Sequence, residues 1–331
     1  MQVVDMHCDT IMRIVEIRDT GKQVFLDKND LNIDINKLKK GQYMLQNFAI
    51  FTPLKMVENP VLNTQRGIDC FYQEIEKNSK DINPVFTYQD IEENAKNGMI
   101  SAMLTLEEGA VVFDSLAMLR NYYRLGVRMI TLTWNFANGI GYPNFESSKN
   151  NTFKDLFTIN TKDGLTPFGK KYVQEMERLG IIIDVSHLSD AGFYDVLKYT
   201  TKPFVASHSN ARTVCGVARN MSDEMIIALA KRGGVMGINY CGDFLLPTDN
   251  GGAKSYVKDM VKHIQHIVSV GGIDCVGLGS DFDGIDPNLE MNDASKLPML
   301  EKALQEVGFT QEEIAKIFYK NVLRVYKEIL K

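Results

Sequence analysis

Three of the five histidines in this 331-residue chain stand in short polar stretches that follow apolar runs. The first such stretch is DMHCDT, in which His7 and Asp9 are two positions apart. In an extended strand these two side chains share one face with Asp5, while Cys8 faces the opposite way. A histidine and a carboxylate on one face can hold a metal ion. Alternatively, the carboxylate can fix the tautomer of a buried histidine.

Eight apolar runs, each ending in polar or glycine-rich residues, must position these groups. They are VVDMHCDT from residue 3, MLQNFAIFT from 44, ISAMLTLEEG from 100, VRMITLTWN from 127, GIIIDVSHLS from 180, PFVASHSN from 203, GGVMGINY from 233 and CVGLGSDFDG from 275. Segments of helical period lie between them, for example after residue 70 and from residues 115, 167 and 222. This alternation predicts a (β/α)8 barrel, with an open doubly wound sheet as the alternative. No change in composition divides the chain, so we expect one domain over residues 1–331.

In such a barrel the reactive groups lie at the C-terminal ends of the strands. The polar residues at the ends of the predicted strands are His7, Asp9, Glu107, Glu108, His187, His208, Asp281 and Asp283. The two remaining histidines, His263 and His266, are three positions apart in a helical segment. We expect those two at the surface or in helix packing.

The strand-end residues form a nitrogen and oxygen ligand set without thiolate, which suits zinc, manganese, cobalt or iron. There are more ligands than the three or so that one catalytic ion needs, so the set predicts two ions bridged by a carboxylate. Such a pair lowers the pKa of a shared water toward about 7 and presents hydroxide to a carbonyl carbon. We therefore predict hydrolysis, with Asp281 moving the proton from the attacking water to a leaving amine. A calcium loop starting at Asp281 is excluded because Asp286 stands where that loop needs glycine.

Together these motifs resemble the membrane (renal-type) dipeptidases, a family of metallopeptidases with two zinc ions in a (β/α)8 barrel. The resemblance covers nearly the whole chain, through DMHCDT, LEEG from residue 106, IIDVSH from 182, SHSNAR from 207, ARN from 218 and GSDFDG from 279. It implies that His7 and Asp9 hold one ion and that His187 and His208 hold the other. Glu107 would bridge the two ions, because the next position is usually glycine in the family.

The resemblance also implies a proton-handling role for Asp281 and an Arg219 that binds the substrate's C-terminal carboxylate. A planar guanidinium can bind a carboxylate through two hydrogen bonds, which would select free dipeptides. We also predict substrate contacts for Trp134 and Tyr240. Trp134 stands where the renal enzymes have a histidine that contacts substrate, and an indole can donate a hydrogen bond but cannot accept one. The implied activity is hydrolysis of free dipeptides, with tolerance for a D residue at the C-terminal position.

Composition narrows the partners and the compartment. A net charge of −5 without a dense basic block gives no reason to expect nucleic acid as a partner. The chain ends in VYKEILK without a hydrophobic tail, and no apolar run is long enough for a membrane span, so we expect no membrane partner. Five scattered cysteines predict reduced thiols in a cytoplasmic protein. A homodimer is expected from the resemblance.

Two alternatives stay open at this point. The first is another binuclear amidohydrolase, such as a cyclic amidase or deaminase, but these usually begin with His-x-His where this chain has His-x-Asp. The second is a non-catalytic metal-binding barrel, which the complete ligand set and Asp281 disfavour. The long polar segment 135–166 is expected to be a lid.

Overall fold

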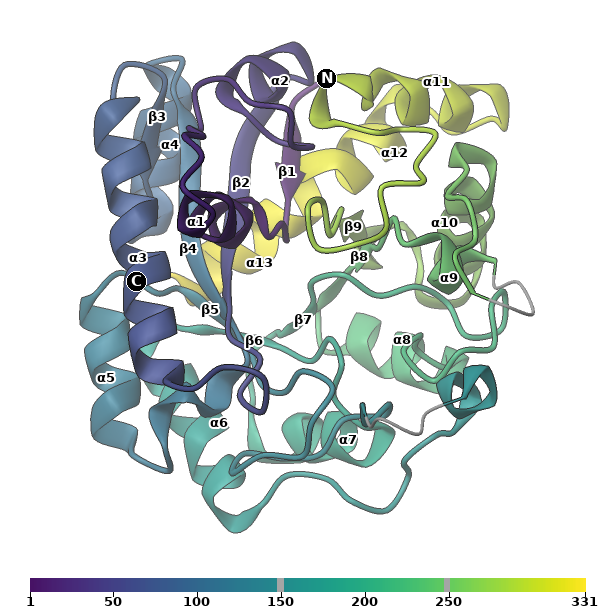
Figure 1. Cartoon of the computed structure of the whole chain (residues 1–331). Helices are drawn as coiled ribbons and strands as arrows, with labels where there is room; N and C mark the ends of the chain where they lie inside the picture. The colour runs from purple at the N-terminus through teal and green to yellow at the C-terminus, as the bar shows by residue number, and fades with distance from the viewer. Residues whose placement is uncertain (148–151, 247–250) are drawn as a thin grey trace.

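The computed structural model describes residues 1–147, 152–246 and 251–331. Its strands form one parallel sheet, and eight of them close into the predicted (β/α)8 barrel, with helices around the outside (Figure 1). Around the ring the strands are β1 (Val3–Asp5), β2 (Tyr43–Phe51), β4 (Ile100–Glu107), β5 (Met129–Thr131), β6 (Ile182–Asp184), β7 (Val205–Ala206), β8 (Val235–Ile238) and β9 (Val276–Leu278), which pairs with β1. Each ring strand lies within one of the eight predicted runs or starts one residue before it. Strand β3 (Ile82–Pro84) was not predicted and pairs with the first residues of β4.

The four segments predicted to be helical are helices. The α-helices are α1 (Thr10–Asp19), α2 (Ile35–Lys40), α3 (Pro60–Lys77), α4 (Tyr88–Lys96), α5 (Leu116–Arg124), α6 (Pro167–Leu179), α7 (Asp190–Tyr199), α8 (Asp223–Lys231), α9 (Gly242–Leu245), α10 (Val257–Gly271), α11 (Pro298–Glu306), α12 (Gln311–Ala315) and α13 (Asn321–Ile329). Short 3₁₀ turns cover Gly109–Val112, Phe153–Phe157, Ile273–Cys275 and Ala294–Lys296, and a π-helical turn covers Lys316–Lys320. The Thr166, Ser189 and Ser222 side chains cap α6, α7 and α8 by accepting a backbone N–H.

The barrel interior is apolar toward the N-terminal ends of the strands, where the C-terminal helix α13 packs against it. Side chains from seven of the ring strands form one buried cluster with α13, and its members include Val4, Leu45, Met103, Met129, Ile182, Val205, Val235, Val322, Val325 and Ile329. Asn47 lies within the barrel, and its Nδ2 donates a 2.7 Å hydrogen bond to the hydroxyl of Tyr326 on α13. Because apolar side chains fill this end of the barrel, polar groups can gather only at the opposite rim, at the C-terminal ends of the strands.

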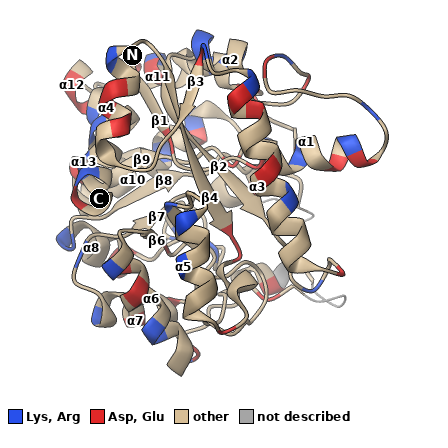
Figure 2. Ribbon diagram, turned by 90° about the vertical axis from the view of Figure 1, so that its left-hand side faces the viewer, with Lys and Arg blue, Asp and Glu red and all other residues tan. Residues whose placement is uncertain are grey.

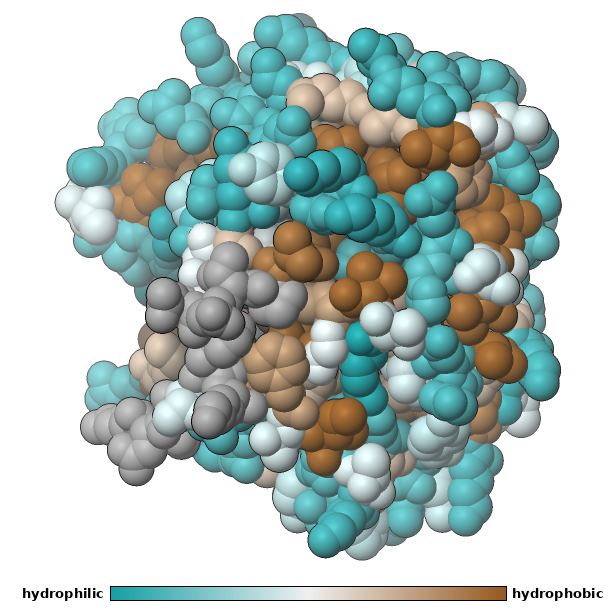
Figure 3. Space-filling view, turned by 90° about the vertical axis from the view of Figure 1, so that its right-hand side faces the viewer, coloured by the Kyte–Doolittle hydropathy of each residue, from teal (hydrophilic) through white to brown (hydrophobic). Residues whose placement is uncertain are grey.

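The outer surface carries mixed charge. Figure 2 shows basic and acidic residues on the same outer helices, including α3 and α6. The face in Figure 3 is largely hydrophilic with separate apolar patches. Within the described ranges, no helix combines the length and apolar character needed to cross a membrane.

Candidate metal centre

The five predicted metal ligands come together at the C-terminal rim of the barrel. Each is at most 9% exposed. His7 and Asp9 follow β1, Glu107 is the last residue of β4, and His187 and His208 follow β6 and β7. Three groups place one potential ligand atom per residue within 4.8 Å of the others: His7 with Asp9 and Glu107, Glu107 with His187 and His208, and His7 with His208 and Asp281. Glu107 belongs to the first two groups.

The local backbone at the first two residues differs from the extended strand assumed from the sequence. Strand β1 ends at Asp5, and Asp9 is the residue before α1, with φ −102° and ψ 10°. The carboxylate of Asp5 accepts hydrogen bonds from the backbone and hydroxyl of Ser280 and is not part of the ligand cluster. His7 and Asp9 lie between β1 and α1, on either side of Cys8, which forms an isolated parallel bridge with Phe282.

The carboxylate of Glu107 lies between the two groups. Its Oε2 is 3.3 Å from His7 Nε2, and its Oε1 is 3.1 Å from His187 Nε2 and 3.6 Å from His208 Nε2. The two nitrogens on the second side, His187 Nε2 and His208 Nε2, are 3.2 Å apart. One carboxylate thus presents a different oxygen to each side, as a bridging ligand does.

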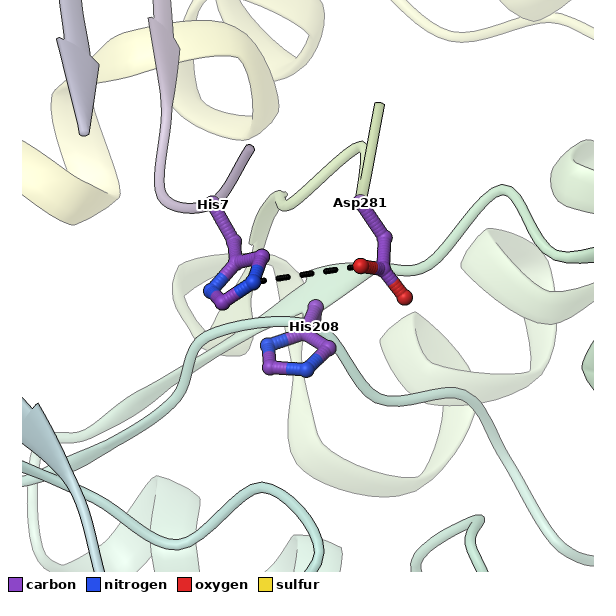
Figure 4. Close-up of side chains that lie close together, drawn as sticks. All are labelled: His7, His208 and Asp281. Carbon is purple, nitrogen blue, oxygen red and sulfur yellow. Dashed lines mark ion pairs between the residues drawn. The ribbon is translucent and has the colours of Figure 1, made fainter. Parts of the chain in front are cut away.

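Several buried polar atoms of the cluster make no hydrogen bond within the described part of the chain: His7 Nδ1, His7 Nε2 and Asp9 Oδ1. His7 Nε2 nevertheless lies 3.4 Å from a carboxylate oxygen of Asp9 and 3.3 Å from one of Glu107. Figure 4 shows the imidazole of His7 beside that of His208, and a dashed line from His7 to Asp281. The centroids of the two imidazole rings are 3.9 Å apart. Asp281 Oδ1 is 3.8 Å from His7 Nε2. Unpaired buried nitrogen and oxygen atoms are costly without a ligand, so this donor set fits divalent ions.

The pKa values in the cluster follow burial and neighbouring charge. Burial and the charge of Arg219 lower the pKa of His187. Burial and the charge of His7 lower the pKa of His208 well below its usual value. Burial opposes the charged form of His7, yet the carboxylates of Glu107 and Asp9 raise its pKa well above the usual value. Neutral imidazoles are the form that binds a metal ion, and His187 and His208 are held in it.

Residues that the sequence did not single out orient the cluster. Asn135 Oδ1 is 2.9 Å from His187 Nδ1, and Ser207 Oγ is 2.7 Å from His208 Nδ1. Asn239 Nδ2 donates a 2.8 Å hydrogen bond to Asp281 Oδ2. Such contacts fix ring and carboxylate orientation around a metal site. Only Ser207 had a sequence signal, because it directly precedes a predicted ligand.

The backbone at the rim is strained at two site residues. His187 and Asp281 have φ values of 69° and 61°, in the left-handed region that side chains other than glycine rarely adopt. Gly284 also faces the cluster, since a Cβ added there would lie 2.1 Å from Asp9 Oδ2 and 2.9 Å from Asp281 Oδ1. Strain of this kind is concentrated at functional sites in proteins.

The cluster opens into a cavity of about 320 Å³. Its lining combines acidic and aromatic residues: Asp9, Phe51, Glu107, Trp134, Asn135, His187, Cys241, Asp243, Phe244, Asp281, Gly284, Ile285 and Asp286. Asp281 and Trp134, both predicted at the site, line this cavity. The volume suits a small molecule rather than a folded partner.

Arg219 is 7% exposed and lies against the second ligand pair. Its Nη1 donates to Ser209 Oγ at 2.7 Å and its Nη2 to the His208 carbonyl at 2.8 Å. Its Nε has no hydrogen-bond partner among the described residues. Burial lowers the pKa of Arg219, while the charges of Asp281, Asp184 and Glu107 raise it. Arg219 is not one of the residues that line the cavity.

Tyr240, for which we predict a substrate contact, has a buried side chain. Its side chain is 1% exposed and packs edge-on against Phe282, with ring centroids 5.4 Å apart. Among the described residues it does not line the cavity. The geometry gives no support to a substrate contact by Tyr240.

The remaining strand-end acids turn away from the ligand cluster. Glu108 accepts hydrogen bonds from the backbone N–H of Ala110 and from Asn138 Nδ2. Asp283 accepts from the Thr10 hydroxyl and from the backbone N–H of Asn32. Both acids therefore stabilise connecting segments.

The two other histidines lie outside the cluster. His263 is fully buried in helix packing and His266 pairs with Asp223 at 2.7 Å. Segment 135–166 contributes Asn135 to the cavity, and residues 148–151 of the predicted lid lie outside the described residues.

A (β/α)8 barrel with this cluster at its C-terminal rim is a metallohydrolase architecture, and comparison with known proteins gives the family. The model of the membrane dipeptidase family (peptidase family M19) matches residues 1–331. An uncharacterized dipeptidase of Schizosaccharomyces pombe is 34% identical over 348 residues, covering 99% of this chain and 80% of that protein. The chain belongs to the membrane dipeptidase family and is a metallopeptidase of the dipeptidase class.

Two solved structures share the fold. One is a metallopeptidase described as dipeptidase AC, with a TM-score of 0.88 and 24% identity over 100% of this chain and 99% of that one. The other is a metallopeptidase from Rhodobacter sphaeroides liganded with a phosphinate mimic of the dipeptide L-Ala-D-Ala. It has a TM-score of 0.88 and 22% identity over 99% of both chains.

Proposed function

We propose that this protein hydrolyses free dipeptides with two divalent ions, zinc in the first place, held by His7, Asp9, Glu107, His187 and His208. The observation that carries the proposal is the position of Glu107, whose two oxygens face separate groups of buried nitrogen ligands at 3.3 and 3.1 Å. When bound, two such ions lower the pKa of a shared water, supply hydroxide and polarise the scissile carbonyl.

The chain's own residues supply proton transfer and orientation. Asp281 receives the proton of the attacking water at Oδ1 and delivers it to the leaving nitrogen. Its other oxygen, Oδ2, stays fixed by Asn239 at 2.8 Å. Fixing one oxygen keeps the other directed at the reacting atoms, which lowers the entropic cost of proton transfer.

Arg219 binds the C-terminal carboxylate of the dipeptide in this proposal. Support comes from its burial beside the ligand cluster and from its Nε, which has no hydrogen-bond partner among the described residues. An amidated dipeptide has no carboxylate to offer and would leave the guanidinium unpaired. A contact with the carboxylate alone does not select the configuration of the C-terminal residue, so we also propose tolerance for a D residue. The ligand of the Rhodobacter sphaeroides structure, a mimic of L-Ala-D-Ala, is consistent with that tolerance.

The experiment that tests this function measures metal content and dipeptide hydrolysis on the same samples. Wild-type protein is expected to hold two ions per chain, and to cleave L-Ala-L-Ala and L-Ala-D-Ala but not their amides. His187→Ala should lose about one ion per chain and most of the activity. His266→Ala removes a histidine outside the cluster and should keep both ions.

The outcomes separate the parts of the proposal. One ion per wild-type chain would refute the bridged pair. Two ions without cleavage of any dipeptide would refute the substrate class, and equal cleavage of free and amidated dipeptides would refute the role of Arg219.

Three further features are part of the proposal. We infer a homodimer, which sedimentation would test. We infer a cytoplasmic location, because the five cysteines are free thiols, four of them buried. We also infer a single domain over residues 1–331, so unfolding should occur in one transition.

A further inference from the structure

One side of the cavity is built from aromatic rings. Phe51 is the last residue of β2 and Trp134 follows β5, and both line the cavity. Their ring centroids are 5.0 Å apart in an edge-on arrangement, and Phe136 also packs edge-on against Trp134, at 5.4 Å. Phe51 and Trp134 are partly exposed whereas Phe136 is buried, so the first two present ring surface to the cavity and the third supports them. We name Phe51, Trp134 and Phe136 the aromatic wall.

The aromatic wall is held in place from behind by Glu108. This carboxylate accepts a hydrogen bond from the backbone N–H of Trp134 at 3.4 Å through Oε2. Through Oε1 it accepts one from Asn138 Nδ2 at 2.5 Å. Glu108 adopts φ 88°, a backbone conformation costly for a residue other than glycine. The backbone that carries Trp134 is thus anchored next to the residue proposed to bridge the metal ions.

The Phe51 end of the aromatic wall faces Arg219 across the ring. Phe51 ends β2 and Arg219 follows β7, and these two strands are four places apart in the eight-stranded ring. Trp134 follows β5, two places from β7, and packs against Phe51. Trp134 also lies next to the cluster, with its ring centroid 6.3 Å from that of His187.

This placement fixes the direction in which a dipeptide can lie. With its C-terminal carboxylate at Arg219 and its scissile carbonyl beside Glu107, the N-terminal residue extends toward the opposite side of the ring. We propose, building on the dipeptidase function proposed above, that the aromatic wall is the subsite for the N-terminal side chain and selects large apolar, above all aromatic, side chains. Ring-to-ring contact and loss of apolar surface from water favour such side chains over small ones.

The test compares three substrates, L-Phe-L-Ala, L-Ala-L-Phe and L-Ala-L-Ala, on the metal-loaded protein. We expect kcat/KM for L-Phe-L-Ala to exceed that for L-Ala-L-Ala by about 10- to 100-fold, because one apolar group in a pocket gives discrimination of this order. The gain for L-Ala-L-Phe should be several-fold smaller. The ratio between substrates is independent of the fraction of active enzyme, so partial loss of folded protein does not affect it.

Variants then assign the preference to the wall. Trp134→Ala should reduce the L-Phe-L-Ala to L-Ala-L-Ala ratio about tenfold or more, mainly through KM. Trp134→Phe should restore most of it. Phe113→Ala removes an aromatic side chain that is 60% exposed and lies outside the cavity lining, so the ratio should stay at the wild-type value.

Each result supports or overturns the subsite. A wild-type preference for L-Ala-L-Phe would overturn the proposed direction of binding, and an unchanged ratio in Trp134→Ala would overturn the role of the wall. In either case cleavage of L-Ala-L-Ala would leave the dipeptidase function standing. Failure of the metal-loaded protein to cleave any of the three substrates would overturn the dipeptidase function and the subsite together.

Discussion

We predict that His263 makes the free energy of unfolding depend on pH. Its side chain is fully buried on α10 and contacts Ala211, which follows β7, and Leu245, the last residue of α9. The same short helix carries Asp243 and Phe244, which line the cavity. Nδ1 accepts the backbone N–H of Ala211 at 3.1 Å, and Nε2 donates to the carbonyl of Leu245 at 3.0 Å. One acceptor and one donor are the pattern of a neutral imidazole. Protonation would place a second N–H against the N–H of Ala211 and leave both without an acceptor.

The size of the effect follows from the pKa. Burial lowers the pKa of His263 from 6.5 to about 4, although the nearby Asp259 opposes the shift. Between these values the unfolded chain binds a proton that the folded chain does not, so stability falls as pH falls. The contribution is fully present above pH 6.5 and is lost progressively toward pH 4. Proton linkage gives a loss of about 2 kcal/mol in the free energy of unfolding from pH 7.5 to pH 5.

Urea unfolding at the two pH values, for wild type and His263→Gln, measures this contribution. The variant keeps the surrounding charges of Asp259, Lys262 and His266, so its other acid-dependent losses match those of wild type. We expect the variant to be less stable at pH 7.5 and the gap to narrow by about 2 kcal/mol at pH 5. His266→Gln is the matched control. His263 is still present in this variant, so its free energy of unfolding should change with pH as that of the wild type does. An equal pH dependence in wild type and His263→Gln would refute the reasoning.

Three further predictions concern the cavity. Gly284→Ala would place a Cβ 2.1 Å from Asp9 Oδ2, so metal affinity in a chelator competition should fall about 10- to 100-fold, and an unchanged affinity would contradict this crowding. Asn239→Leu removes the donor to Asp281 Oδ2, and kcat should fall about tenfold or more with little change in KM, whereas a loss confined to KM would argue against proton transfer by Asp281. Chelation should lower the melting temperature in calorimetry and zinc should restore it, because the ions bind only the folded cluster; an unchanged melting temperature would speak against bound ions.

The fold could be predicted from the sequence because the ring strands are almost wholly buried. Burial on both faces produces continuous apolar runs, and the change to polar residues at each C-terminal end marks where the strand ends. Strand β3 could not be predicted in this way. It has three residues, ends in Pro84 and pairs only with Ile100–Ala102 at the start of β4, so it has neither the length nor the pattern that a prediction needs.

The candidate site was predictable to the extent that its chemistry requires unusual residue types. Histidines and acids at strand ends are rare enough to be noticed, whereas amides in loops are common. Asn135 contacts a histidine 52 residues further along the chain, and Asn239 contacts a carboxylate 42 residues further along. Only the closed ring brings these partners together, so nothing local in the sequence distinguishes the two amides. The substrate contact predicted for Tyr240 gains no support from the structure. The direction in which a side chain points depends on packing with distant residues, which the sequence alone does not give.

Asp5 and Asp184 show how the two halves of the cluster are kept in register. Each is the last residue of its strand, β1 or β6, and each precedes a predicted ligand by two or three positions. Each carboxylate accepts the backbone N–H two positions further along, and both the N–H and the hydroxyl of one serine from the neighbouring strand end: Ser280 for Asp5 and Ser207 for Asp184. A buried carboxylate is tolerated when several donors satisfy it, and these donors come from two chain segments that it thereby ties together. The ligands on both sides of Glu107 thus depend on carboxylates that do not themselves face the cavity.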